Sequence, residues 1–128
     1  MNVLIDTHVL IWALVKPRRL SARTMRLLTD INTGIMVSSA SIWELGIKYH
    51  NGKMPEMARI FPQIQRHLIR LQARELQISH SHALMASSLP MVHKDPFDRM
   101  LVAQALVEGI PLVTDDELLE RYAVLTIW

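Results

Sequence analysis

The sequence of 128 residues contains no cysteine, and this absence excludes disulfide bonds and thiolate metal sites. A chain without cysteine suits a reducing cytosol, so we expect a cytoplasmic protein. Internal repeats, linkers and low-complexity segments are also lacking. With 50% hydrophobic and 20% charged residues, the chain is typical of a globular protein. Its length predicts a single domain, residues 1–128.

The apolar stretch at the start has no basic leader, and it carries Asp6 and His8 in its middle. We therefore expect core here, neither a signal peptide nor a spanning helix, and no membrane partner. Histidines at metal-binding spacing are lacking as well. His80 and His82 are two residues apart, so on a helix they point to different sides, which disfavours a joint metal site.

The net charge of +2 hides an uneven distribution. Residues 16–74 carry eleven Lys or Arg against three acids, whereas the rest of the chain carries three against nine. A basic middle beside acidic ends suits a polyanion held near a carboxylate cluster. Ordinary solvated helix faces explain the same counts equally well.

Apolar runs alternate with helical patterns along the whole chain. Strands are predicted at 2–5, 35–37, 75–78, 111–114 and 124–128, and helices at 8–15, 21–31, 41–52, 55–71, 79–89 and 96–107, with a short helix to about 121. Pro62 predicts a kink or break in the long fourth helix. This alternation predicts an α/β fold with a parallel sheet and helices on both faces.

The segment His93–Gly109 contains the clearest helix start. Asp95 is the predicted N-cap, Pro96 takes the first helical position, and Asp98 takes the position from which a side chain reaches back to the cap amide. The helix that follows is apolar nearly all round, which predicts that it is buried. A buried helix would thus open on two carboxylates.

Three further acids follow predicted strands. Asp6 ends the first strand, Glu44 takes the capping-box position after a predicted N-cap at Ser41, and Asp116 follows the strand that closes at Thr114. Helix capping explains each acid singly. If the strands are parallel, however, the acids emerge at one edge of the sheet, where they would repel one another. A hard divalent cation, Mg²⁺ or Mn²⁺, resolves this repulsion with oxygen ligands.

The motifs LIDTHVLIW, SSASIWELGIK and HKDPFDRMLVAQALVEGIPLVTDD, with the terminal strand, resemble the PIN domain in the form found in VapC toxins. The resemblance spans essentially the whole chain and implies a three-layer PIN-like fold. It also implies a Mg²⁺ or Mn²⁺ dependent endoribonuclease that acts on RNA as a toxin. Such proteins are commonly dimers, neutralised by a small VapB-like antitoxin whose tail reaches the acidic pocket.

Residue by residue, the resemblance matches the motif acids to Asp6, Glu44, Asp98 and Asp116. Asp6 and Asp98 are expected to bind the metal directly, and Glu44 and Asp116 to hold metal-bound water or a second ion. Thr114 is expected to orient water. The implied reaction is in-line attack of metal-activated water on an RNA phosphodiester, leaving 5′-phosphate and 3′-hydroxyl ends.

The roles of the neighbouring acids Asp95 and Asp115 stay open, because either can replace or supplement a motif acid. Arg99 is expected to form a surface ion pair, with phosphate binding as the alternative. Trp12 and Trp43 are expected in the core, with base stacking as the alternative.

Two other functions compete with a nuclease. A phosphorylated receiver domain would need an acid pair after the first strand and a lysine after a late strand, and both are missing. A catalytically inactive PIN-like module that binds RNA or protein would keep all four acids, so the sequence does not separate it from an enzyme.

Overall fold

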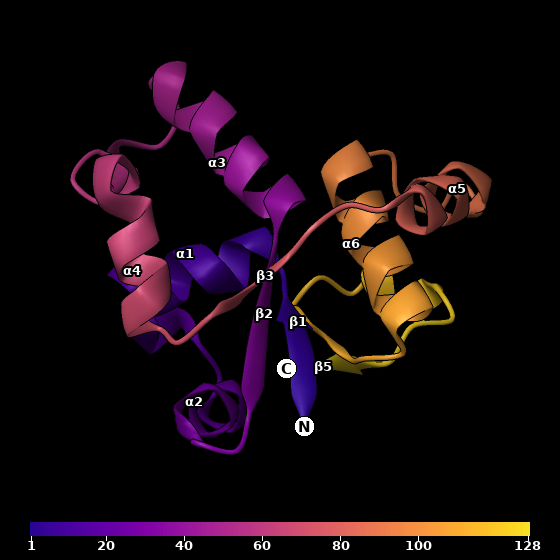
Figure 1. Cartoon of the computed structure of the whole chain (residues 1–128), viewed down its shortest axis with the longest axis horizontal. Helices are drawn as coiled ribbons and strands as arrows, with labels where there is room; N and C mark the ends of the chain where they lie inside the picture. The colour runs from indigo at the N-terminus through magenta and orange to yellow at the C-terminus, as the bar shows by residue number, and fades with distance from the viewer.

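The computed structural model describes residues 1–128 and contains one sheet of five parallel strands (Figure 1). The strands lie in the order β3-β2-β1-β4-β5. Their bounds are β1 Asn2–Ile5, β2 Gly34–Ser38, β3 Arg74–Leu76, β4 Leu112–Val113 and β5 Thr126–Ile127. The predicted parallel α/β fold is therefore confirmed, although the last two strands are shorter than their apolar patterns suggested.

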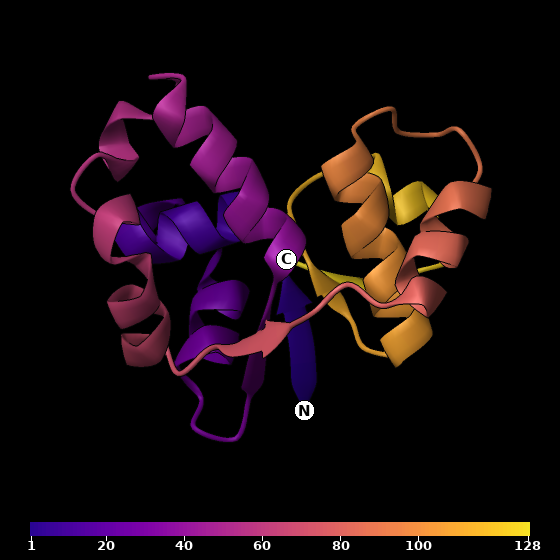
Figure 2. The same ribbon diagram turned by 45° about the horizontal axis from the view of Figure 1, so that its top comes forward.

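Helices cover both faces of this sheet. α1 (Thr7–Val15), α2 (Ala22–Thr29), α3 (Ser39–His50) and α4 (Ile64–Arg70) lie on one side, and α5 (His80–Ser88) and α6 (Pro96–Glu108) on the other (Figure 2). Each side has its own apolar cluster, which is why the molecule has three layers. No helix is both long enough and apolar enough to cross a bilayer.

The central strand β1 is buried on both faces, as its uninterrupted apolar run predicts. Val3 and Ile5 pack into the cluster under α1, α3 and α4, whereas Leu4 packs against α6. All three side chains have 0% exposure. The period of two along a strand thus explains how one short segment serves both cores.

Two predicted helix boundaries were wrong. The N-cap of α3 is Ser38, whose Oγ accepts from the Ala40 amide at 3.0 Å, so the helix begins two residues before the predicted cap Ser41. α2 ends at Thr29, not near Ile31. The break that Pro62 predicted within residues 55–71 is confirmed, because this segment forms two short 3-10 turns followed by α4.

The order of strands creates a switch point beside β1. The chain travels from β1 to β2 through α1 and α2 on one face, and it reaches β4 through α5 and α6 on the other. The Asp6 amide donates to the Val113 carbonyl at 3.0 Å, so Asp6 lies beside the end of β4. In open α/β sheets a crevice for ligands forms at such a point.

Candidate metal centre

Asp6 begins the site at the carboxyl end of β1. It is the N-cap of α1, and its Oδ1 accepts from the Val9 amide at 2.7 Å. Only 4% of the residue is exposed. Burial raises the pKa of Asp6 to about 6, with the Thr114 side chain and the Val9 amide acting in the opposite direction. Asp6 therefore caps α1 and is also a buried carboxylate with a raised pKa.

Glu44 lies in the interior of α3, so the predicted capping-box role is wrong, since the cap is Ser38. Its side chain is buried and pairs with Lys48 on the next turn, with 2.7 Å between Oε2 and Nζ. The other oxygen, Oε1, is buried and has no hydrogen-bond partner in the protein. An orphaned carboxylate oxygen is costly, which indicates that a group absent from the chain normally satisfies it.

Asp98 lies in the first turn of α6, and Asp95 is the N-cap of that helix. Asp95 Oδ1 accepts from the Phe97 amide at 2.8 Å and the Asp98 amide at 3.4 Å. The expected return bond from Asp98 to the Asp95 amide is not formed, because that amide donates to His93 Nδ1 at 3.1 Å. Asp95 therefore performs the capping, and the carboxylate of Asp98 takes no part in it.

The carboxylate of Asp98 lies among other acids. Burial is the largest cause that raises its pKa to about 7, and the charges of Asp95, Glu44 and Asp6 raise it further, while His93 acts against them. The structure thus brings together acids from the end of β1, from α3 and from the start of α6. Their negative charges add to the effect of burial, which is the larger cause that makes ionisation of Asp98 unfavourable.

Asp116 joins this group through His93. His93 Nε2 lies 3.2 Å from Asp116 Oδ2 and 3.3 Å from Asp98 Oδ2. The three ligand-type atoms all lie within 4.8 Å of one another, a spacing at which one cation can be shared. Asp116 Oδ1 accepts from the Leu118 amide at 2.9 Å, and its own amide donates to Thr114 Oγ1 at 3.1 Å.

His93 is the residue of this centre to which the sequence interpretation gave no role. The available signal was its position two residues before the N-cap Asp95, where a ring nitrogen meets the cap amide. A single histidine beside an acid lacks the spacing to a second histidine that marks a metal site in a sequence. The contact that matters, with Asp116, spans 23 positions in the chain.

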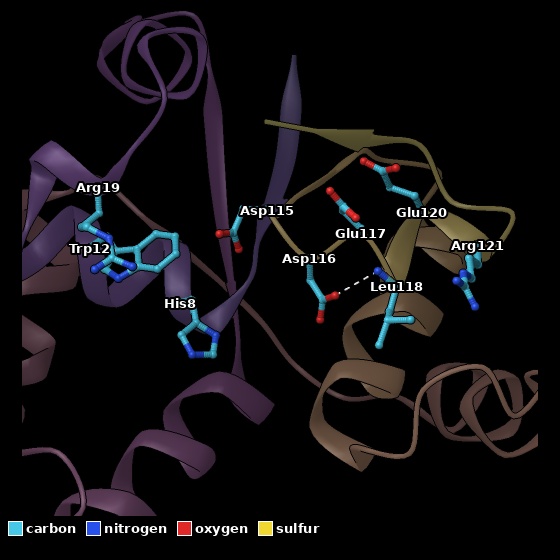
Figure 3. Close-up of a pocket in the computed structure, with 9 residues that line it drawn as sticks. All are labelled: His8, Trp12, Arg19, Asp115, Asp116, Glu117, Leu118, Glu120 and Arg121. Carbon is cyan, nitrogen blue, oxygen red and sulfur yellow. Dashed lines mark hydrogen bonds between the residues drawn. The ribbon is translucent and has the colours of Figure 1, made fainter.

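The neighbouring acid Asp115 takes a different direction from Asp116. In Figure 3, Asp115 lies toward His8 and Trp12, whereas a hydrogen bond joins Asp116 to the Leu118 amide. Both acids line an open pocket of about 970 Å³ that does not include Asp6, Glu44 or Asp98. The charge of Asp115 raises the pKa of Asp6, so Asp115 also belongs to the electrostatic surroundings of the centre.

The donor set fits a hard divalent cation. The carboxylates of Asp6, Glu44, Asp98 and Asp116 offer oxygen atoms, and Lys48 is the only lysine or arginine paired with any of them. The unpartnered Glu44 Oε1 and the raised pKa values of Asp6 and Asp98 indicate an uncompensated need for positive charge. Mg²⁺ and Mn²⁺ are the ions that prefer such ligands.

Arg99 serves neither of the roles predicted for it. Its guanidinium donates to the carbonyls of Pro90 at 2.9 Å, Ala86 at 3.0 Å and Leu89 at 3.0 Å. These bonds hold the segment that leads from α5 into α6. Arg99 therefore anchors the loop that contains His93, and the expectation of a surface ion pair is wrong.

The two tryptophans are less buried than predicted. Trp43 is 64% exposed and touches Phe97 edge to face, with ring centroids 5.2 Å apart. Trp12 is half-buried, with the Arg19 guanidinium 5.0 Å from its ring centroid. The expectation of core packing is wrong for Trp43, which sits immediately before Glu44 and is open to solvent.

Comparison with known proteins gives similar chains over nearly the full length. Ribonuclease VapC22 of Mycobacterium tuberculosis is 28% identical, over 99% of this chain and 98% of that protein. The structure of VapBC2 from Rickettsia felis, bound to a DNA fragment from their promoter, has a similar fold with a TM-score of 0.75. The two chains are 17% identical, and the matched region covers 99% of this chain and 98% of the VapBC2 chain.

VapBC-1 from nontypeable Haemophilus influenzae has a TM-score of 0.65 at 17% identity, covering 99% of this chain and 97% of that one. The family model of the PIN domain matches residues 3–125. That match includes both strand ends and both helices from which the four acids project, and this chain therefore belongs to the PIN domain family.

Proposed function

We propose that this chain is a Mg²⁺ or Mn²⁺ dependent endoribonuclease and the toxin of a toxin and antitoxin pair. The observation that carries the proposal is the position of Asp98, whose pKa is raised to about 7 by burial and by the charges of neighbouring acids. Acids gathered in this way need a cation if they are to be ionised at neutral pH. The name of the relative VapC22, a ribonuclease, supports RNA as the substrate.

Asp6 and Asp98 would bind the cation directly, and Glu44 and Asp116 would hold its water or a second ion. When bound, the cation neutralises charge on the phosphodiester and lowers the pKa of a water molecule. Glu44 offers Oε1, which accepts no hydrogen bond from the protein, while Lys48 Nζ donates to Oε2 at 2.7 Å. The ion pair with Lys48 restricts the rotation of the Glu44 carboxylate, so the position of the unpartnered Oε1 is also restricted.

Thr114 would orient a water molecule at the end of β4. Its Oγ1 accepts from the Asp116 amide at 3.1 Å, which leaves the hydroxyl proton to donate. The Thr114 side chain lowers the pKa of Asp6, as a hydroxyl that donates to the carboxylate does, so the second lone pair of Oγ1 is the group that would accept from water. Thr114 is 3% exposed, so its hydroxyl is held in one place with little competition from bulk water.

The products would be RNA fragments with 5′-phosphate and 3′-hydroxyl ends, since the attacking nucleophile is water and not the ribose 2′-hydroxyl. A reaction of this kind does not leave a 2′,3′-cyclic phosphate. The chemistry of the ends therefore distinguishes the proposed mechanism from metal-independent ribonuclease action.

The similar structures VapBC2 and VapBC-1 support a VapB-like antitoxin as the partner of this chain. We propose that the antitoxin binds beside the acidic centre and that the toxin forms a homodimer in the cytoplasm. Co-expression with a VapB-like antitoxin, followed by size-exclusion chromatography with light scattering, measures both associations.

The test is an RNA cleavage assay with purified protein in Mg²⁺, in Mn²⁺ and in chelator, using structured and single-stranded RNAs. Asp98→Asn removes one charge from the centre while keeping the size of the side chain. Glu56→Gln is the matched control, because Glu56 is an exposed acid outside the centre. We expect cleavage only with a cation, and only in the wild type and the control.

Cleavage that persists in chelator or in Asp98→Asn would refute the proposal. Fragments with 2′,3′-cyclic phosphate ends would refute the role of water as nucleophile. Growth arrest on expression that Asp98→Asn relieves would separate the toxin from the inactive binding module.

A further inference from the structure

His93 is held on four sides. Its amide donates to the Tyr122 hydroxyl at 2.9 Å, and its carbonyl lies 3.5 Å from Arg99 Nη1. The ring accepts from the Asp95 amide at Nδ1 and meets Asp98 and Asp116 at Nε2. These contacts fix the backbone of His93 and the orientation of its ring.

The contact at Nδ1 determines which ring nitrogen carries the proton. A backbone amide can only donate, so Nδ1, at 3.1 Å from the Asp95 amide nitrogen, must accept and carries no proton. The proton of the neutral ring is therefore on Nε2. Nε2 therefore donates to Asp116 Oδ2, at 3.2 Å, and Asp98 Oδ2 lies 3.3 Å from the same nitrogen.

The same contact opposes metal binding by this histidine. A ring nitrogen that carries a proton has no lone pair for a cation, and moving the proton to Nδ1 would place two donors face to face at Asp95. The spacing of His93, Asp98 and Asp116 by itself would suit a three-residue metal site. The Asp95 amide, which donates to Nδ1, opposes the tautomer that His93 would need as a metal ligand.

We infer that His93 is a positioning residue that holds the carboxylate of Asp116 through its Nε2 proton, with the carboxylate of Asp98 beside it, and that it is not a metal ligand. The Asp95 amide sets the ring tautomer, and Arg99 and Tyr122 hold the loop. Asp116 is then oriented at both oxygens, by His93 at Oδ2 and by the Leu118 amide at Oδ1. The inference rests on the proposed function only in taking these acids as the cation site.

The first test uses the wild-type protein loaded with Mn²⁺ and measures electron spin echo envelope modulation. A nitrogen bonded directly to Mn²⁺ gives a strong ¹⁴N coupling, whereas a histidine that only positions the ligands does not. We expect no directly bonded nitrogen. A strong coupling that disappears in His93→Gln would overturn the inference while leaving the proposed nuclease intact.

The second test compares two substitutions by Mn²⁺ titration. In His93→Gln the side-chain nitrogen is as many bonds from Cα as Nε2, so a donor to the acids is kept. In His93→Asn the amide group corresponds to Nδ1, so that donor is lost. Loss of a group that orients metal ligands weakens binding by about 10-fold to 100-fold, and we expect this loss for His93→Asn but a change of less than about 3-fold for His93→Gln.

His80→Gln is the matched control, because His80 is an exposed histidine on α5. Equal weakening in His93→Gln and His93→Asn, or no weakening in either, would overturn the positioning role. Circular dichroism verifies the fold of each variant, and the spin-echo result on the wild type needs no variant to be folded. Failure of the wild type to bind Mn²⁺ at all would instead refute the proposed function.

Discussion

The clearest consequence of the crowded acids is that removing one charge should stabilise the protein when no metal is bound. Asp98→Asn keeps the shape of the side chain and removes its charge. The pKa of Asp98 rises from 3.8 to about 7 in the folded state. Three units at about 1.4 kcal/mol each give roughly 4 kcal/mol as the upper bound for the cost of ionised Asp98. Since 21% of the side chain is exposed, we expect about half of that bound.

The effect should depend on pH in a defined direction. Below about pH 4 both the folded and the unfolded wild type bind the proton, so wild type and variant should have similar stability. Between pH 4 and 7 the folded state keeps a proton that the unfolded state releases, so wild-type stability falls as pH rises. Above pH 7 the cost is complete, while asparagine does not titrate.

The assay is urea unfolding of the metal-free proteins at pH 4.5 and at pH 8. We expect Asp98→Asn to exceed the wild type by about 2 kcal/mol at pH 8 and by much less at pH 4.5. Glu56→Gln, which removes an exposed acid, should change neither value. A variant that is no more stable than the wild type at pH 8 would refute the electrostatic reasoning.

Three further substitutions test separate parts of the structure. Glu44→Gln should weaken Mn²⁺ binding at least about 10-fold in a titration, because it removes the charge beside the unpartnered oxygen; unchanged affinity would exclude Glu44 from the centre. Arg99→Leu should lower the free energy of unfolding by about 2 to 4 kcal/mol, because three carbonyls lose their donor, and a cost below 1 kcal/mol would contradict the anchoring role. Gly109→Ala should cost about 1 kcal/mol in the same denaturation assay, since Gly109 ends α6 at φ 65°, and an unchanged midpoint would contradict this strain.

The strands, their parallel arrangement and the ends at which the acids emerge followed from the sequence. The short apolar run at Asn2–Ile5, rich in β-formers, predicted a strand buried on both faces, and β1 has this position. The start of α6 was equally clear, since Asp95 and Pro96 each favour only one position in a helix.

The parts that the sequence did not predict depend on contacts between distant residues. Ser38, Ser39 and Ser41 are all acceptable N-caps, and the choice of Ser38 follows from the register of β2 against β3. The exposure of Trp43 and the anchoring role of Arg99 depend on which helices face them. The function of His93 requires Asp116, which is 23 positions away.

The central claim is that Asp6 and Asp98, with Glu44 and Asp116 close by, share a divalent cation. Anomalous diffraction from crystals grown with Mn²⁺ tests it most directly, because the peaks mark the ion itself. The account predicts a peak bound by carboxylate oxygens of Asp6 and Asp98, with no bond to His93 Nε2. A peak elsewhere on the molecule, or none near these acids under conditions in which the protein cleaves RNA, would contradict it.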